Sequence, residues 1–414
     1  MTISMNPPAS YEVLITPLIA RDEYGTSINL NSDLNISNFT ISVGSIQESI
    51  DNGDFDIGVF TLSSITLKCV NVNGKLSGPE DRRGIFPFSR DKAKVTINYN
   101  PGKLHQKTLV FRGLIDERAT RENLSTNEIS LKVLSLNSVF NRLRVPAGII
   151  RAKQSISSSI TTLLSLPEIA AVLSFDRHDM NLGLDYEIDN PISLYNQKFL
   201  DVLNQLMIAS NSVITIDQFR EQIFIRPRNF ETDNILELKG PHSLSNTLFD
   251  EQNILSIKNY NNGIHRVFNS IFVNDIFYSD TLSADIYGSN TKSFNFPFIT
   301  DPEKIERLAQ RILFTFRWPK IEMDIQITTF AGRWVDILDM ATVDFPKRLL
   351  PSDSTALPTY GSAKYGEFNY PYEYGTEIGK NKIFKVVGKA HNIKNFTTTL
   401  KLREIGTNFN DGYK

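Results

Sequence analysis

The sequence predicts a mainly β protein of the α+β class, in which two related antiparallel β-barrel domains flank a small α/β unit. Three observations lead to this prediction. Segments that alternate apolar and polar residues, separated by turn-forming residues, fill both ends of the chain. Apolar residues at helical spacing gather in the middle. A hairpin pattern that ends near residue 135 returns at the end of the chain, near residue 405.

The composition is that of an ordinary packed protein. Of the 414 residues, 41% are apolar and 22% are charged, and the formal net charge of −2 argues against nucleic-acid binding through a basic surface. The single cysteine, Cys69, excludes an internal disulfide framework, and we interpret it as a buried strand residue. We find no signal-peptide pattern and no apolar run near the roughly 20 residues of a membrane span, so we expect no membrane insertion.

Residues 1–145 are predicted to form the first β-barrel domain. Stretches such as ITLKCVNV, KVTINYN, TLVFRGLID and EISLKVLS have strand character. The turn sequences NVNGK and NPGK separate some of them, and no long helical pattern interrupts them.

Residues 146–232 are predicted to form the α/β middle domain. One helical face in this region is made by Phe199, Leu203, Leu206 and Met207. A hairpin follows, with strands at 213–217 and 223–226 and a turn around Arg220 and Glu221.

Residues 233–414 are predicted to form the second β-barrel domain, with a helix at 301–316. Asp301 suits the N-cap and Pro302 the first turn of this helix. Its apolar stripe is Ile305, Leu308, Ala309, Ile312, Leu313 and Phe316. We expect this stripe to pack against the second barrel.

A Tyr-rich loop insertion is predicted at 347–382. Tyrosine buries a large ring while keeping a polar tip, and so suits protein interfaces. The candidate partner-contact residues are Tyr360, Tyr365, Tyr370, Tyr372 and Tyr374. A flexible low-complexity loop is the alternative.

The repeated hairpin pattern compares residues 108–135 with residues 382–405. Gly113 matches Gly388 and Lys132 matches Lys401, with a shorter connection in the second copy. Alternation alone is common, so two unrelated hairpins remain the alternative. If the repeat is real, residues 10–140 should superpose on 235–345 together with 380–406, and a trimer would present a ring of six similar barrels.

No catalytic, cofactor-binding or metal-binding residue is assigned, and we expect no enzyme activity. Phosphate-loop, HExxH, CxxC and GxSxG motifs do not occur in the sequence, and the five histidines are scattered. One segment gathers Asp176, His178, Asp179 and Asp185, which could bind a cation or act in acid–base chemistry. We favour a solvated loop there, because nothing nearby in the sequence supplies a pocket or a nucleophile.

These segments together resemble the tail hub, or baseplate hub, proteins of long-tailed bacteriophages and the hub half of type VI secretion spikes. The stretches that carry the likeness include SIQESIDNGDFDIGVFTLSSITLKCVN, LVFRGLID, DPEKIERLAQRILFTF and, most specifically, FKVVGKAHNIKNFTTTLKLREI.

The resemblance implies a structural protein of the virion, at the tail tip or baseplate, made in the host cytoplasm. It implies a homotrimeric ring of pseudo-six-fold barrels that adapts the six-fold tail tube to a three-fold spike and lines the channel for genome delivery. The implied partners are further copies of the chain, the tail tube or distal tail protein, the central spike or tail-tip protein, the tape-measure protein and DNA passing through the channel. The alternative is a glycan-binding or glycan-cleaving tail-associated protein.

Overall fold

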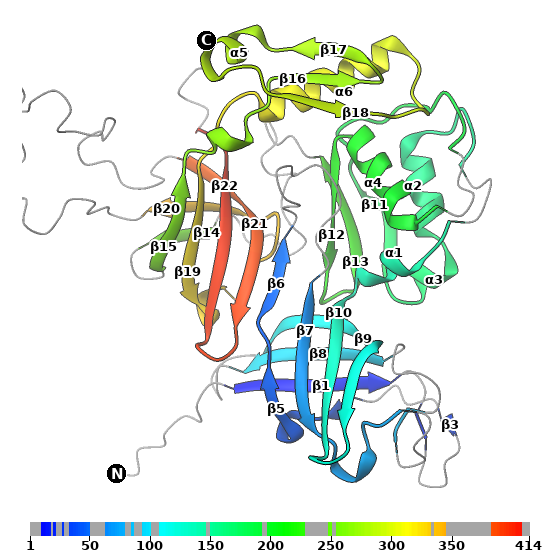
Figure 1. Cartoon of the computed structure of the whole chain (residues 1–414), viewed down its shortest axis with the longest axis vertical. Coiled ribbons are helices and arrows are strands. Elements are labelled where there is room, and N and C mark those ends of the chain that lie inside the picture. The colour runs from blue at the N-terminus through cyan, green and yellow to red at the C-terminus, as the bar shows by residue number, and fades with distance from the viewer. Residues whose placement is uncertain are drawn as a thin grey trace, which may run out of the picture.

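The chain folds into two large β-sheets, a middle α/β unit and a smaller α/β unit (Figure 1). The computed structural model describes residues 10–17, 20–21, 27–28, 33–49, 63–78, 84–86, 93–100, 107–145, 150–192, 197–227, 247–250, 254–332, 335–344 and 382–407. The predicted mainly β, α+β fold class is confirmed.

The first sheet is antiparallel and has the strand order β4-β1-β8-β9-β10-β7-β5. Its strands are β1 (Ser10–Pro17), β4 (Leu34–Asn35), β5 (Thr40–Val43), β7 (Ser64–Val70), β8 (Ala93–Asn100), β9 (Thr108–Asn123) and β10 (Glu128–Ser135). The short strands β2 (Ala20–Arg21) and β3 (Ser27–Ile28) pair with each other. The sheet curls, so that β1 and β8 run across the direction of β7 and β10 (Figure 1). Alternating residues such as Leu67, Val95 and Leu131 are fully buried on its inner face.

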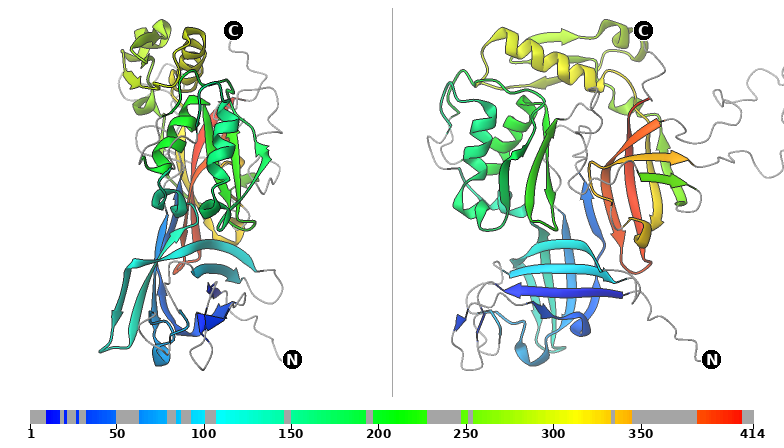
Figure 2. Two further views of the ribbon diagram at one scale, coloured as in Figure 1. Left: turned by 90° about the vertical axis from the view of Figure 1, so that its right-hand side faces the viewer. Right: turned by 180° about the vertical axis from the view of Figure 1, so that it is seen from behind.

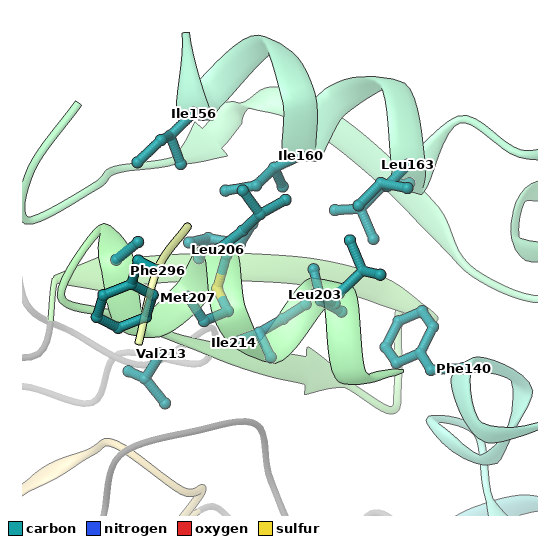
Figure 3. Packing of buried hydrophobic residues seen from close by; sticks show 14 of the residues in the cluster. Phe140, Ile156, Ile160, Leu163, Leu203, Leu206, Met207, Val213, Ile214 and Phe296 are labelled. Atoms are coloured by element: carbon teal, nitrogen blue, oxygen red, sulfur yellow. The ribbon is translucent and has the colours of Figure 1, made fainter. Parts of the chain in front are cut away.

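The middle unit packs helices on a three-stranded sheet of order β11-β13-β12. Its elements are α1 (Ser138–Arg142), α2 (Ile156–Leu164), α3 (Pro167–Ala170), β11 (Ser174–Met180), α4 (Phe199–Ala209), β12 (Ser212–Asp217) and β13 (Gln222–Pro227). Figure 3 shows α2 and α4 meeting through Ile160, Leu163 and Leu206, above the strand residue Ile214. The predicted helical face of α4 and the hairpin after it are both confirmed.

A smaller unit is formed by a segment that lies, in the sequence, between strands of the second large sheet. It contains β16 (Ser270–Val273), β17 (Ile276–Ser279), α5 (Thr281–Tyr287), β18 (Thr291–Phe294) and α6 (Pro302–Phe316). The helix predicted at 301–316 is present, with the Asp301 side chain accepting the N–H of Glu303 at 3.0 Å. Figure 2 shows α6 lying along these strands, at the end of the molecule opposite the first sheet.

The predicted packing of the α6 stripe is wrong. Leu308 and Ile312 lie in the core of the middle unit together with Ile271 of β16, whereas the second sheet has a separate core around Ile325. The reason is the strand pair β16–β17, which covers the stripe: Ile271 lies in the same core, and Tyr278 packs against it. The helix therefore belongs to a small α/β unit that shares its core with the middle domain.

The second sheet has the strand order β14-β20-β21-β22-β19-β15. Its strands are β14 (Thr247–Asp250), β15 (Ile254–Asn261), β19 (Glu322–Thr328), β20 (Met340–Asp344), β21 (Lys382–Asn392) and β22 (Thr397–Thr407), with α7 (Thr329–Gly332) following β19. Its pairings are antiparallel except that β14 runs parallel to β20.

The two large sheets share one strand order, as the repeat predicts. With the edge strand β4 left aside, the first sheet runs β1-β8-β9-β10-β7-β5 and the second β14-β20-β21-β22-β19-β15. If the six strands of each sheet are numbered in the order in which they occur along the chain, both sheets have the spatial order 1-4-5-6-3-2. The difference lies in the first strand, because β1 runs antiparallel to β8 and β14 parallel to β20.

The predicted match of Gly113 with Gly388 is wrong in register. Gly113 pairs with Ser135, whereas Gly388 pairs with Lys401, the counterpart of Lys132. The predicted polar connection of the first hairpin is instead strand, because β9 continues through a bulge to Asn123. Gly113 is needed where it stands, since a Cβ there would lie 2.3 Å from the carbonyl oxygen of Leu134.

Candidate assembly site

Strand β6 (Ile46–Ser49) joins the N-terminal part of the chain to the second sheet. It pairs antiparallel with β21, with Ile46 opposite His391 and Gln47 opposite Ala390. Along the sequence, β6 lies between β5 and β7 of the first sheet. The side chain of Ile46 is buried in the hydrophobic core of the first sheet. One strand therefore ties the two sheets together, a link that the alternation of residues 46–49 could not reveal.

The tip of the β21–β22 hairpin makes a second contact between the sheets. Phe396 stacks on Tyr11 with ring centroids 5.4 Å apart, and its ring lies 6.1 Å from that of Tyr99. Ile393 and Phe330 also pack against the first core. Burial raises the pKa of the Tyr11 hydroxyl to about 12, so this residue is neutral at physiological pH.

The middle unit docks on the first sheet through its β12–β13 turn. The Arg112 N–H donates to Gln218 Oε1 at 2.8 Å, and the Arg112 guanidinium reaches Glu221 Oε1 at 3.1 Å. Lys94 pairs with the same carboxylate at 2.5 Å. A single glutamate thus bridges two strands of the first sheet, and this polar contact sets the position of the middle unit.

Asp189 holds the N-terminus of α6 against the middle unit. Its carboxylate accepts the backbone N–H groups of Thr300 at 2.7 Å and Asp301 at 2.9 Å, and it pairs with Lys304. Burial opposes ionisation of this carboxyl group, but the hydrogen bonds from Lys304 and the backbone outweigh that effect and lower the pKa of Asp189.

A buried ion cluster fixes the start of β19. The Glu322 carboxylate accepts the Nε–H of Arg403 at 2.7 Å and lies 2.8 Å from Nε of Arg266. These contacts join β22 to the short helical turn Ile264–Arg266 that precedes the smaller unit. They anchor that unit on the second sheet.

Two buried polar side chains lie on β21 beside β6. Lys389 donates to the carbonyl oxygen of Val335 at 2.5 Å, and Nδ1 of His391 lies 2.7 Å from the Thr398 hydroxyl. Burial, and secondarily the charge of Lys389, lowers the pKa of His391 well below its ordinary value. The imidazole is therefore neutral where the two sheets join.

The residues proposed from the sequence for chemistry do not converge. Asp176 accepts the backbone N–H of His178 at 2.9 Å, Asp179 accepts from Gln222, and Asp185 accepts the N–H of Ser157 at the start of α2. Within the described ranges no group of three His, Cys, Asp or Glu residues is placed to hold a metal ion. These side chains serve local structure.

Two further sequence predictions have different outcomes. Cys69 is buried in β7 as predicted, and burial raises the pKa of its thiol to about 11. The candidate contact residues Tyr360, Tyr365, Tyr370, Tyr372 and Tyr374 lie outside the described residues.

The smaller unit exposes several large apolar side chains. The rings of Phe272 and Phe277 lie 5.0 Å apart on β16 and β17, and Leu282 and Ile286 of α5 are also exposed. Exposed apolar side chains of this size suit contact with another protein. None of the helices in the described part of the chain is long and apolar enough to cross a membrane.

Comparison with known proteins gives similarity of structure only. No family model and no curated protein matches the sequence. Among solved structures, the tail protein from Neisseria meningitidis MC58 matches with a TM-score of 0.57 and 9% identity, covering 96% of this chain and 97% of that one. This chain has the fold of that tail protein. The predicted resemblance is therefore confirmed at the level of the fold.

Two further solved structures extend the comparison. The 43 kDa tail protein of prophage MuSo2 from Shewanella oneidensis has a TM-score of 0.50 and 9% identity, over 95% of this chain and 97% of that one. A chain of the lidded Francisella PdpA–VgrG complex has a TM-score of 0.51 and 12% identity, over 99% of this chain and 55% of that one. The tail fold thus spans nearly the whole of the present chain.

Proposed function

We propose that this protein is the structural hub of a phage tail or a related injection machine. Three copies form a ring of six similar sheets that adapts a six-fold tail tube to a three-fold spike or tip, and the ring lines the channel through which the genome passes. The protein acts in the virion without catalysing a reaction.

The observation that carries this proposal is the repeated strand order of the two large sheets. A chain with two similar sheets gives a three-fold assembly an approximate six-fold face, which is what a symmetry adaptor needs. Strand β6 and the Phe396 contact support the same role, because both join the sheets within each chain. The likeness to tail proteins over nearly the whole chain is further support.

The proposed partners are those that the resemblance to tail hub proteins implies. The ring contacts the tail tube or distal tail protein on its six-fold side and the spike or tail-tip protein on its three-fold side. The tape-measure protein and DNA occupy or cross the channel. The exposed apolar side chains of β16, β17 and α5 are available for such contacts.

Particle symmetry tests the proposal directly. We expect three copies of the chain around the tail axis in an image of the native particle, and a trimer in light scattering of the purified protein at rising concentration. A stable hexamer, or a single copy per particle, would contradict it. Turnover on purified cell wall would show that the protein is an enzyme instead.

A further inference from the structure

The connection between the second and third strands differs between the two large sheets. In the first sheet it joins β5 to β7 and contains β6, which pairs with residues 388–391 of β21, the fifth strand of the second sheet. In the second sheet it joins β15 to β19 and contains the whole smaller unit. The first connection thus links its own sheet to the fifth strand of the other sheet, and the smaller unit is the corresponding connection of the second sheet.

The fifth strand of the first sheet, β9, has a half with only one neighbouring strand. β8 pairs with residues 108–114 of β9, and beyond them only β10 lies beside β9 in the part of the chain that the structure describes. Residues 116–123 of β9 pair with 128–132 of β10, just as residues 388–392 of β21 pair with 397–401 of β22. The outer half of β9, residues 116–123, is therefore the counterpart of the part of β21 that β6 covers.

The outer half of β9 exposes arginine side chains and ends beside an apolar one. The Arg121 guanidinium donates to the carbonyl oxygens of Arg118 and Thr120, each at 2.9 Å. Because these bonds occupy backbone acceptors, we expect a partner to bind here through side chains and not as an added strand. Arg118 and Arg121 are exposed, and 84% of the surface of Leu124, which follows the strand, is exposed. The acidic residues of this half are only partly exposed: Asp116, Glu117 and Glu122.

The smaller unit offers an apolar strand edge with acidic neighbours. Phe272 of β16 lies opposite Phe277 of β17, and 52% of the surface of Phe277 is exposed. β17 is an edge strand of its sheet, and its sequence Ile-Phe-Tyr-Ser has none of the charged residues or prolines that commonly protect such an edge. Asp275 in the β16–β17 turn and Asp285 in α5 are exposed and make no ion pair with the other described residues.

These two surfaces lie too far apart to meet within one chain. Figures 1 and 2 show the smaller unit at the end of the molecule opposite the β9–β10 hairpin. A contact between them therefore joins two copies of the chain.

We infer that the smaller unit of one copy binds the outer half of β9 in the next copy, with Leu124 packing on Phe272 and Phe277. The contact repeats between copies the link that β6 makes to β21 within one chain, and it brings exposed arginines to exposed carboxylates. Each chain carries one surface of each kind at opposite ends, so head-to-tail contacts among three copies close into a ring. The inference rests on the proposed trimer and names the surfaces through which it assembles.

Substitutions on both surfaces of the full-length protein separate assembly from folding. We expect Phe277→Ser and Leu124→Ser each to weaken self-association by about tenfold or more, because each removes apolar area from the contact. Both should keep a melting temperature close to that of the wild type, because both side chains are exposed in the single chain. The double variant should associate little more weakly than either single variant, since both changes remove one shared contact. Leu255→Ser, at an exposed leucine of β15 outside the contact, is the matched control and should associate like the wild type.

A photo-crosslinking amino acid at position 277 tests the location of the contact, in the purified trimer or, if the chain alone is monomeric, in the assembled particle. Mixing isotopically labelled and unlabelled copies distinguishes cross-links between chains from those within a chain. We expect cross-links between chains that map to 116–124. Cross-links elsewhere in the chain or to another protein, or single variants that assemble like the wild type, would overturn this inference alone. A single copy of the chain per particle would overturn the proposed function and this inference together.

Discussion

At the scale of single residues, His391 is a buried group whose ionisation is expected to couple the stability of the fold to pH. In the fold, burial and the nearby charge of Lys389 lower the pKa of its imidazole well below 6.5. In the unfolded chain the pKa is close to the ordinary value, so acid protonates the unfolded state first. The stability contributed by the neutral imidazole is fully present above about pH 6.5 and is lost as the pH falls toward the folded pKa.

The direction of this pH dependence gives a prediction for His391→Gln, a substitution that keeps a polar side chain but removes the titratable group. We expect the melting temperature of the wild type to fall more than that of the variant between about pH 7.5 and about pH 5.5. Thermal unfolding followed by circular dichroism measures both. His178→Gln, at an exposed histidine on β11, is the matched control. Equal falls in the wild type and His391→Gln would show that His391 does not carry the effect.

At the scale of elements, the β21–β22 tip holds the two sheets together at a conformational cost. Phe396 adopts a left-handed backbone, which is rare for a bulky residue. Phe396→Asn places there the residue found at the equivalent position 127, which tolerates this backbone, and removes the stacking on Tyr11. We expect a net loss of about 1–2 kcal/mol in the free energy of unfolding. Lys394 lies in the same turn and is exposed, so Lys394→Ala should change the free energy of unfolding little. If Phe396→Asn were more stable than the wild type, the backbone strain at Phe396 would outweigh its stacking on Tyr11.

The helix α6 shows how the smaller unit is held. The side chain of Leu308 is fully buried in the core that also contains Ile271. Leu308→Ala should therefore lower the free energy of unfolding by about 2–5 kcal/mol. Arg307→Ala changes the exposed side of the same helix and should stay within about 0.5 kcal/mol of the wild type. Chemical denaturation of both variants measures the difference. Similar values for the two would show that the buried stripe contributes little.

At the scale of the whole molecule, the Tyr-rich segment inserted between β20 and β21 remains a predicted assembly contact. Deleting residues 355–378 should leave the melting temperature near that of the wild type, because the segment has no periodic apolar face with which to build a core. The deletion should impair incorporation into infectious particles, which a plaque assay measures. Normal yields of infectious particles would show that this segment is not part of an assembly contact.

The sequence by itself determined the elements whose signals are local. The α6 helix was predictable because Asp301, Pro302 and the apolar stripe all lie within one continuous stretch, and the β12–β13 hairpin because turn and strands are adjacent. The repeated strand order was predictable in outline, since each closing hairpin carries a Leu-Lys pair at Lys132 and Lys401.

Only the tertiary structure decided which surfaces these elements bury. The alternation of apolar and polar residues predicts that the Ile46 side chain is buried. It does not predict that the Ile46 backbone pairs with His391, more than 300 residues away. A bulge in β9 displaces Gly113 from the register of Gly388, and no local pattern marks a bulge of that size. Leu124 and Ile393 have the same place in equivalent turns, yet one is exposed and the other packs on a core. That difference depends on which sheet lies next to each tip, and long-range packing sets it.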